Sequence, residues 1–175
     1  SIFAAETVLE YLRSRGIRQL DYFVLTYPAP ERAGGMLLLL HKLSLHTYVR
    51  PPVDGTNWVY RRLHTLIKDT TAVEVVQPER TLSLQLDDET VLSPLGPYEE
   101  VFTEGKFAPQ DQSLAWLITR GNVRFLVASD LTSAGERLLV RMIDDLRADV
   151  LVAANHGSRT STSTVFLEAV APRLA

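Results

Sequence analysis

Cysteine is absent from all 175 residues of the chain. Disulfides, thiolate metal sites and a thiol nucleophile are therefore excluded, and any bound metal must be held by histidine, aspartate or glutamate. An excess of positive charge is also missing, because 18 lysines and arginines face 21 acidic residues and the formal net charge is −3. Proteins normally meet a phosphate backbone with clustered cations. Contact with nucleic acid would therefore have to be local.

Long apolar runs are absent as well. The longest, residues 36–40, is far shorter than the ~20 residues of a membrane helix, and no signal-peptide pattern opens the chain. The chain itself is therefore expected to be soluble. Its 46% hydrophobic content is enough for a single domain with a buried core over residues 1–175. Because the chain begins without methionine inside a helical pattern and stops where a strand would begin, we expect a fragment of a longer protein.

Apolar periodicity alternates between helical and extended spacing along most of the chain. It predicts helices at residues 8–12, 35–43, 58–67, 132–146 and 162–170. Strands are predicted at residues 22–25, 46–50, 73–76, 81–86, 91–95 and 149–153, the third to fifth of them antiparallel. A hairpin is expected over residues 113–129 with its turn at 120–122, and the aperiodic segment 96–112 is expected to be a mobile loop. Strands between helical layers favour an α/β (α+β layered) architecture.

Polar sequences follow three of the predicted strands: "LTYPAPERAGG", "ASDLTSAGE" and "ANHGSRTSTS". In layered folds such strand ends carry ligands. Asp130 and His156 occupy matching places in the second and third sequences, and their side chains suit Zn, Mn or Fe. The residues alone leave another interpretation open, in which Asp130 belongs to a helix N-cap and His156 is a hydrogen-bonded loop residue. A nucleophile–base pair of Ser158 and His156 is disfavoured, because no orienting acid is evident.

Other chemistry-bearing side chains favour structural roles. His41, His46 and His64 lack partner ligands at useful spacing and are expected to be surface or packing residues. Trp58 and Trp116 lie within periodic apolar segments and are expected to be in the core. The pair Arg61 and Arg62 is expected on a solvated helix face.

Three blocks of the chain resemble the metallo-β-lactamase-fold domain of ComEC-type competence proteins, the bacterial DNA-uptake channel family. They are "YLRSRGIRQLDYFVLTYPAPERAGG", "DQSLAWLITRGNVRFLVASDLTSAGERLL" and "RADVLVAANHGSRTSTSTVFLEAVAPRLA". The last block matches the family's His-His-Gly-Ser-Arg-Thr-Ser run followed by a helix. The resemblance implies a metallo-β-lactamase-like αββα sandwich, incomplete at both ends and with an exposed sheet edge where the family has preceding strands.

The first block departs from the family in its metal ligands. The family reads Leu-Thr-His-Pro-His-x-Asp-His-x-Gly-Gly, and this chain has Tyr27, Ala29, Glu31 and Arg32 at the histidine and aspartate positions. Only Glu31 keeps a carboxylate, which makes it the candidate catalytic residue. Arg32 places a permanent cation where a metal ion would bind, and a guanidinium cannot deprotonate to become a ligand. One hypothesis is that Arg32 takes the metal position and pairs with Asp130 or Glu31.

The later blocks retain more of the family pattern. By resemblance, Asp130 matches the metal-bridging aspartate and His156 matches a histidine of the terminal run, so both are remnant metal-ligand positions. The predicted cleft or phosphate contacts are Asp111, Ser113, Asn155, Ser158, Arg159 and Thr160. Catalytic zinc takes three protein ligands and a water, and a dinuclear site needs more. We therefore expect no cofactor, and Zn or Mn if a metal binds.

The resemblance also implies a function. The chain would be a degenerate, catalytically inactive domain of a DNA-uptake protein of the bacterial inner membrane, on a side that the sequence does not indicate. Its role would be structural or would consist of contacts with DNA or a partner, including the transmembrane channel region of the same parent protein. No small-molecule cofactor is implied. The alternative is a metal-dependent phosphodiesterase or nuclease that degrades the non-transported strand, with Asp130, His156 and Glu31 in its site.

Overall fold

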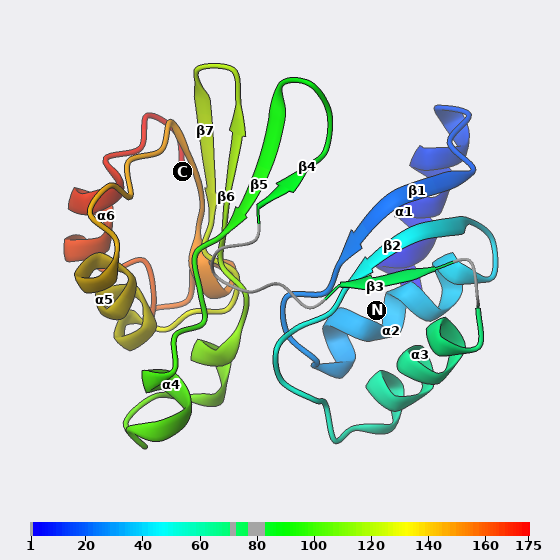
Figure 1. Cartoon of the computed structure of the whole chain (residues 1–175), viewed down its shortest axis with the longest axis horizontal. Helices are drawn as coiled ribbons and strands as arrows, with labels where there is room; N and C mark the ends of the chain where they lie inside the picture. The colour runs from blue at the N-terminus through cyan, green and yellow to red at the C-terminus, as the bar shows by residue number, and fades with distance from the viewer. Residues whose placement is uncertain (1, 71–72, 77–82) are drawn as a thin grey trace. The chain divides into compact units, whose positions relative to one another are not determined.

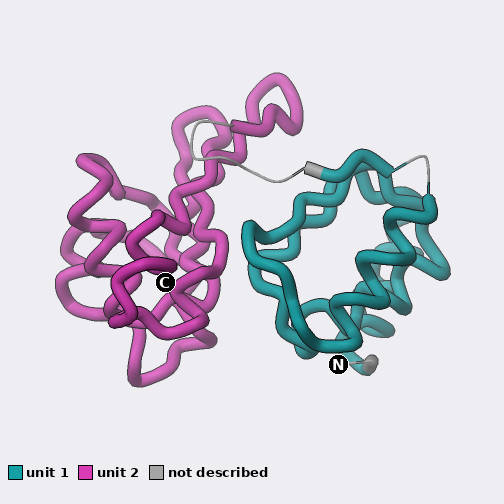
Figure 2. Tube along the Cα trace, turned by 60° about the horizontal axis from the view of Figure 1, so that its bottom comes forward, with its two compact units in different colours: residues 1–77 teal, residues 78–175 magenta. Residues whose placement is uncertain are grey.

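The computed structural model describes residues 2–70, 73–76 and 83–175 (Figure 1). The chain divides into two compact units, residues 1–77 and 78–175 (Figure 2). The described residues form two sheets and six α-helices, which confirms the predicted mixed α/β class. A single domain over residues 1–175 stays a prediction, because two compact units can belong to one domain. None of the helices within the described part is long and apolar enough to cross a membrane.

The first unit is a parallel sheet with three helices. In chain order it contains α1 (Ile2–Ser14), β1 (Gln19–Val24), α2 (Pro30–Leu40), β2 (Ser44–Val49), α3 (Trp58–Lys68) and β3 (Glu74–Val76). The strand order is β1-β2-β3, and both pairings are parallel. Parallel neighbours need a crossover connection, which α2 and α3 supply. α2 packs beside both α1 and α3, and its buried side is made by Ala33, Met36 and Leu39.

The second unit is a mostly antiparallel sheet with helices. It contains β4 (Leu84–Gln85), β5 (Thr90–Pro94), α4 (Glu100–Thr103), η1 (Pro109–Gln112), β6 (Trp116–Arg120), β7 (Val123–Val127), α5 (Ser133–Met142), β8 (Val150–Val152), η2 (Ala154–Gly157) and α6 (Thr164–Val170). The strands run in the order β4-β5-β6-β7-β8, and only β7 and β8 are parallel among these pairs. Leu174 forms a parallel bridge to Val150 beyond β8.

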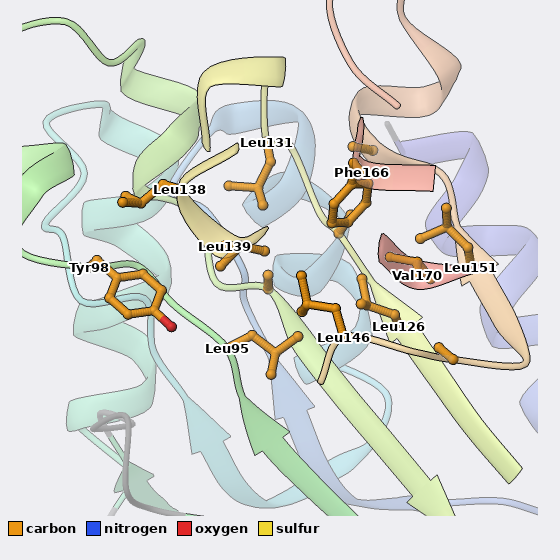
Figure 3. Close-up of a cluster of buried hydrophobic side chains, with 14 of the residues drawn as sticks. Leu95, Tyr98, Leu126, Leu131, Leu138, Leu139, Leu146, Leu151, Phe166 and Val170 are labelled. Atoms are coloured by element: carbon orange, nitrogen blue, oxygen red, sulfur yellow. The ribbon is translucent and has the colours of Figure 1, made fainter. Parts of the chain in front are cut away.

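The core of the second unit lies between this sheet and helices α5 and α6 (Figure 3). α5 contributes Leu138 and Leu139, and α6 contributes Phe166 and Val170. Truncating such a buried side chain to alanine typically costs about 2–5 kcal/mol. The packing fixes the positions of the segments that follow β7 and β8, which are the two segments that carry Asp130 and His156.

The hairpin is confirmed, because β6 and β7 are antiparallel with Arg120 opposite Val123 and a two-residue turn. The antiparallel prediction for the middle strands is half correct. β4 and β5 are antiparallel, but β3 joins the parallel sheet beside β2. Residues 81–82 of the predicted strand 81–86 lie outside the described residues. The wrong assignment of β3 has a simple cause: a three-residue strand shows no periodicity that reveals the direction of its neighbour.

Four further predictions need correction. The helix predicted at 35–43 begins at Pro30, because a proline suits the first helical turn and the glycines that follow do not prevent helix formation. The helix predicted at 132–146 ends at Met142. Segment 96–112, predicted to be a mobile loop, carries the short helices α4 and η1. Trp58 is 69% exposed at the first turn of α3 and is not a core residue, whereas Trp116 is buried as predicted.

Candidate functional site

Asp130 lies in the loop between β7 and α5. Its side chain is buried at 6% exposure, and its N–H group donates a hydrogen bond of 3.3 Å to the Ser113 hydroxyl oxygen. The preceding residue, Ser129, has a left-handed backbone with φ of 56°, which non-glycine residues seldom adopt. The loop therefore holds Asp130 in a defined, buried place at the end of a strand.

Asp111, which the sequence predicts at the edge of a cleft, has a structural task in this arrangement. Only 1% of it is exposed, and its carboxylate accepts hydrogen bonds from the Thr132 N–H at 2.8 Å and the Ala108 N–H at 3.0 Å. The Thr132 hydroxyl lies 2.9 and 3.0 Å from its two oxygens. A Cβ on Gly135 would lie 2.5 Å from Asp111 Oδ1, so α5 needs glycine there. Asp111 and Ser113 thus support the loop that carries Asp130, and their contact with a ligand stays a prediction.

His156 lies in the segment that follows β8. Asn155, His156 and Gly157 have left-handed φ values of 46°, 55° and 74°, so the chain turns sharply at the histidine. The Asn155 N–H donates a hydrogen bond of 2.7 Å to the Ser129 carbonyl oxygen. This bond joins the loops of Asp130 and His156. The side chain of His156 is exposed.

The rest of the "HGSRTS" run presents hydroxyls and one cation. The Ser158 and Thr160 hydroxyls lie 3.0 Å apart, and the Ser133 N–H donates to the Thr160 carbonyl oxygen at 2.8 Å. The Ser161 hydroxyl donates to the Ala154 carbonyl oxygen at 3.0 Å. Arg159 and Thr160 are exposed. The backbone of the run is therefore fixed on its protein side, while Arg159 faces solvent.

Glu136 is a residue of this site that sequence reasoning missed. It lies in the first turn of α5 with 0% exposure, and its two carboxylate oxygens accept the N–H groups of Thr162 and Ser163. The bond from Ser163 is 2.8 Å long. These are the two residues immediately before α6. The sequence signal that could have indicated a buried carboxylate is the position of Glu136 on the same helix face as Gly135, Leu138 and Leu139.

The first-block residues lie in the other unit. Ala29 is the N-cap residue of α2, and Glu31 is exposed in its first turn, where a negative charge stabilises a helix N-terminus. Asn57 fixes the preceding loop, because its amide donates to the Pro28 carbonyl oxygen at 2.6 Å while its carbonyl oxygen accepts the N–H of Tyr60 at 2.8 Å. The pairing of Arg32 with Asp130 or Glu31 stays a prediction from the sequence.

A polar cluster lies near this loop in the first unit. Asp54 accepts a hydrogen bond from Arg50 at 2.7 Å and one from the Tyr60 hydroxyl at 3.5 Å, and the Tyr60 ring stacks on His64 with centroids 5.9 Å apart. Burial raises the pKa of the Tyr48 hydroxyl far above its ordinary value. Burial, followed by the charges of Lys68 and Arg50, lowers the pKa of His64 below 6.5. Burial and these two cations therefore favour a neutral His64, against the opposing charge of Asp54.

Metal binding depends on the donor atoms that these units supply. Asp130 and His156 belong to the second unit and Glu31 belongs to the first. Within residues 2–70, 73–76 and 83–175, no group of three or more histidine, aspartate or glutamate side chains has the arrangement of a metal site. Two ligands in one unit are fewer than the three that catalytic zinc takes from a protein. Neither unit by itself therefore supplies, among its described residues, the donor set of a catalytic zinc.

Comparison with known proteins gives two curated relatives. The chain is 26% identical over 176 residues to ComE operon protein 3 of Bacillus subtilis (strain 168), an alignment that covers 97% of the chain and 21% of the relative. It is 44% identical over 59 residues to Competence protein ComA of Neisseria gonorrhoeae, covering 33% of the chain and 8% of the relative. The chain thus spans about a fifth of the length of the first relative and less than a tenth of the second. No family model matches the chain.

A solved structure supports the fold. The crystal structure of CmlA, a diiron beta-hydroxylase from Streptomyces venezuelae, matches with a TM-score of 0.53 and 16% identity, over 89% of this chain and 34% of that one. CmlA has the metallo-β-lactamase fold, and the two sheets, the strand-end loops and the helices described above therefore define a metallo-β-lactamase-like fold. The chain thus has a metallo-β-lactamase-like fold and is similar in sequence to two competence-related proteins.

Proposed function

We propose that this chain is a catalytically inactive metallo-β-lactamase-like domain of a DNA-uptake protein, and that it serves a structural or DNA-contacting role. The observation that carries the proposal is the donor set. Ala29 and Arg32 supply no metal ligand and Tyr27 stands in place of an imidazole, while the ligands predicted among the described residues of the second unit are Asp130 and His156. Hydrolysis of a phosphodiester by this class of site needs metal-activated water. A domain that cannot hold the metal has no source of that nucleophile.

The proposed DNA contact rests on the run after His156. Arg159 and Thr160 are exposed, and the backbone that carries them is fixed by hydrogen bonds to Ser133 and within the run. An exposed guanidinium on a fixed backbone between two hydroxyl residues suits a phosphate oxygen, because arginine can donate two parallel hydrogen bonds to phosphate. One relative is named a competence protein, and DNA as the source of that phosphate is part of this proposal. A membrane-bound parent protein and contact with its channel region belong to the same proposal.

Metal content and nuclease activity test the inactive state. The purified chain should contain Zn or Mn well below one ion per chain by elemental analysis. It should not cleave single-stranded or double-stranded DNA when Zn or Mn is added. Asp130→Ala should then leave this baseline unchanged, as should Asp144→Ala at an exposed position on the same unit. Near-stoichiometric metal together with cleavage abolished by Asp130→Ala alone would establish the alternative, a metal-dependent nuclease.

The DNA contact has its own test. Binding of a fluorescent single-stranded oligonucleotide should weaken a few-fold in Arg159→Gln and should fall as salt concentration rises, because phosphate contacts release counterions. Arg61→Gln, which removes the same charge from the exposed face of α3, is the matched control. Equal weakening in both variants would attribute binding to overall charge and remove the specific role of Arg159.

A further inference from the structure

A cavity of about 490 Å³ lies beside α5 in the second unit, and its residues are not among those predicted to bind a ligand. It is lined by Lys106, Phe107, Ala134, Arg137, Leu138 and Arg141, and we call it the α5 cavity. Three of the six lining residues are cations and the other three are apolar. A volume of this size is in the range of small-molecule sites, which combine an apolar lining with a few polar groups that fix orientation.

The cations of the α5 cavity are available to a ligand. Arg137 and Arg141 are exposed and make no ion pair with any residue that the structure describes. They lie one helical turn apart on α5, a spacing at which like charges destabilise a helix unless an anion lies between them. Lys106 differs, because it pairs with Glu104 and lies 5.4 Å from the centre of the Phe107 ring. The two arginines are therefore the candidate anion-binding groups, and Lys106 lines the same cavity but already pairs with Glu104.

The apolar part of the lining is fixed. Leu138 is buried in the core of the second unit, and Phe107 packs against the same core. A rigid apolar wall next to two guanidinium groups suits a ligand with a phosphate at one end and a flat or apolar body at the other. An inorganic anion alone would leave that wall uncovered.

A second cavity with cationic lining explains why the α5 cavity stands out. It measures about 400 Å³ and is lined in part by Arg13, Arg18 and Lys42 in the first unit. Arg13 lies in the last turn of α1, and Lys42 lies just beyond α2. Cations at helix C-termini stabilise the terminal carbonyl groups, so their presence there has a structural cause. Arg141 lies in the last turn of α5 and has the same structural cause, whereas Arg137 lies in the middle of α5 and has none.

We propose that the α5 cavity binds a nucleoside phosphate, either as a free nucleotide or as one unit of a single strand. Arg137 and Arg141 hold the phosphate, and the wall of Phe107 and Leu138 covers the sugar and base. The choice of a nucleotide among organic phosphates rests on the proposed DNA-contacting role of the domain. The site does not involve Asp130, His156 or Arg159.

Calorimetric titration of the 175-residue chain tests the proposal with four probes: dTMP, thymidine, inorganic phosphate and a short oligothymidylate. Saturable binding of dTMP or the oligonucleotide is expected, with thymidine and inorganic phosphate at least about tenfold weaker. Tighter binding of dTMP identifies a free nucleotide as the source, and tighter binding of the oligonucleotide identifies a strand. Either result supports the site. Inorganic phosphate binding as tightly as dTMP overturns the assignment to a nucleotide.

Variants locate the binding. The double variant Arg137→Gln/Arg141→Gln should weaken binding by about tenfold or more, since two charge-assisted hydrogen bonds are lost. Arg61→Gln/Arg62→Gln removes the same charge from α3 and should have no effect. Both pairs are exposed, and an unchanged thermal melting temperature checks that they fold. Equal weakening in the two double variants, or no binding of dTMP and oligonucleotide at all, overturns the proposal. Oligonucleotide binding lost only in Arg159→Gln overturns it while leaving the proposed DNA contact in place.

Discussion

The buried carboxylate of Glu136 should be the strongest single polar contribution to the second unit. It accepts the N–H groups of Thr162 and Ser163, one on each oxygen, at 0% exposure. Glu136 lies in the first turn of α5, and its two donors immediately precede α6. The N-terminal ends of both helices are therefore close to its negative charge. These donors hold the segment of His156 against α5.

The cost of removing this contact follows from the two bonds. Hydrogen bonds to a charged group contribute about 1.5–3 kcal/mol each, and a buried donor left without a partner costs a similar amount. Glu136→Gln keeps one acceptor oxygen but turns an NH2 group toward the second N–H donor. We expect a loss of about 2–4 kcal/mol in the free energy of unfolding. For a unit of this size, that loss lowers the melting temperature by on the order of 10–20 °C.

Urea and thermal unfolding of Glu136→Gln measure this effect, and Glu168→Gln is the control. Glu168 is an exposed residue of α6, so its replacement should change stability by less than about 0.5 kcal/mol. Amide NMR resonances of Asn155, Thr162 and Ser163 should shift in the Glu136 variant only. The reasoning fails if Glu136→Gln unfolds within about 0.5 kcal/mol of the unmodified chain.

Two further pairs of substitutions, each a variant with its control, probe packing and pH dependence. Gly135→Ala should destabilise the chain by about 1–3 kcal/mol, because the new Cβ would lie 2.5 Å from the Asp111 carboxylate. Gly34→Ala in α2 should instead stabilise it by up to about 1 kcal/mol, since the closest contact of a Cβ there is 3.8 Å. Equal changes in the free energy of urea unfolding would contradict this prediction. The lowered pKa of His64 means that folding favours its neutral form, so it contributes stability above pH 6.5 that is lost as pH falls through the lowered pKa. His64→Gln should therefore flatten the decline in urea midpoint between about pH 7 and pH 5, while exposed His41→Gln should not; a parallel decline in both would refute the assignment.

The sequence predicted most elements because their local patterns agree with their environment. The turn at Gly121 and the helices of the second unit could be predicted from local sequence patterns alone. The direction of β3 could not be predicted, since it depends on which strand of the first unit lies beside it. Trp58 misled because a large aromatic residue in a periodic segment usually faces the core, whereas here it occupies the exposed first turn of α3.

The candidate site was predictable in its conspicuous residues and unpredictable in those that support them. Asp130 and His156 are recognisable in the sequence as polar residues that follow apolar strands. The sequence does not indicate that a hydrogen bond from the Asn155 N–H to the Ser129 carbonyl oxygen joins their loops. Asp111 and Glu136 look like ordinary acidic residues, and only burial reveals that backbone N–H groups occupy their oxygens. Loss of metal chemistry would leave this scaffold intact, because none of these bonds uses a metal. A domain that lacks the imidazole ligands can therefore still hold the backbone that carries Arg159 in place, which is what the proposed DNA-contacting role requires.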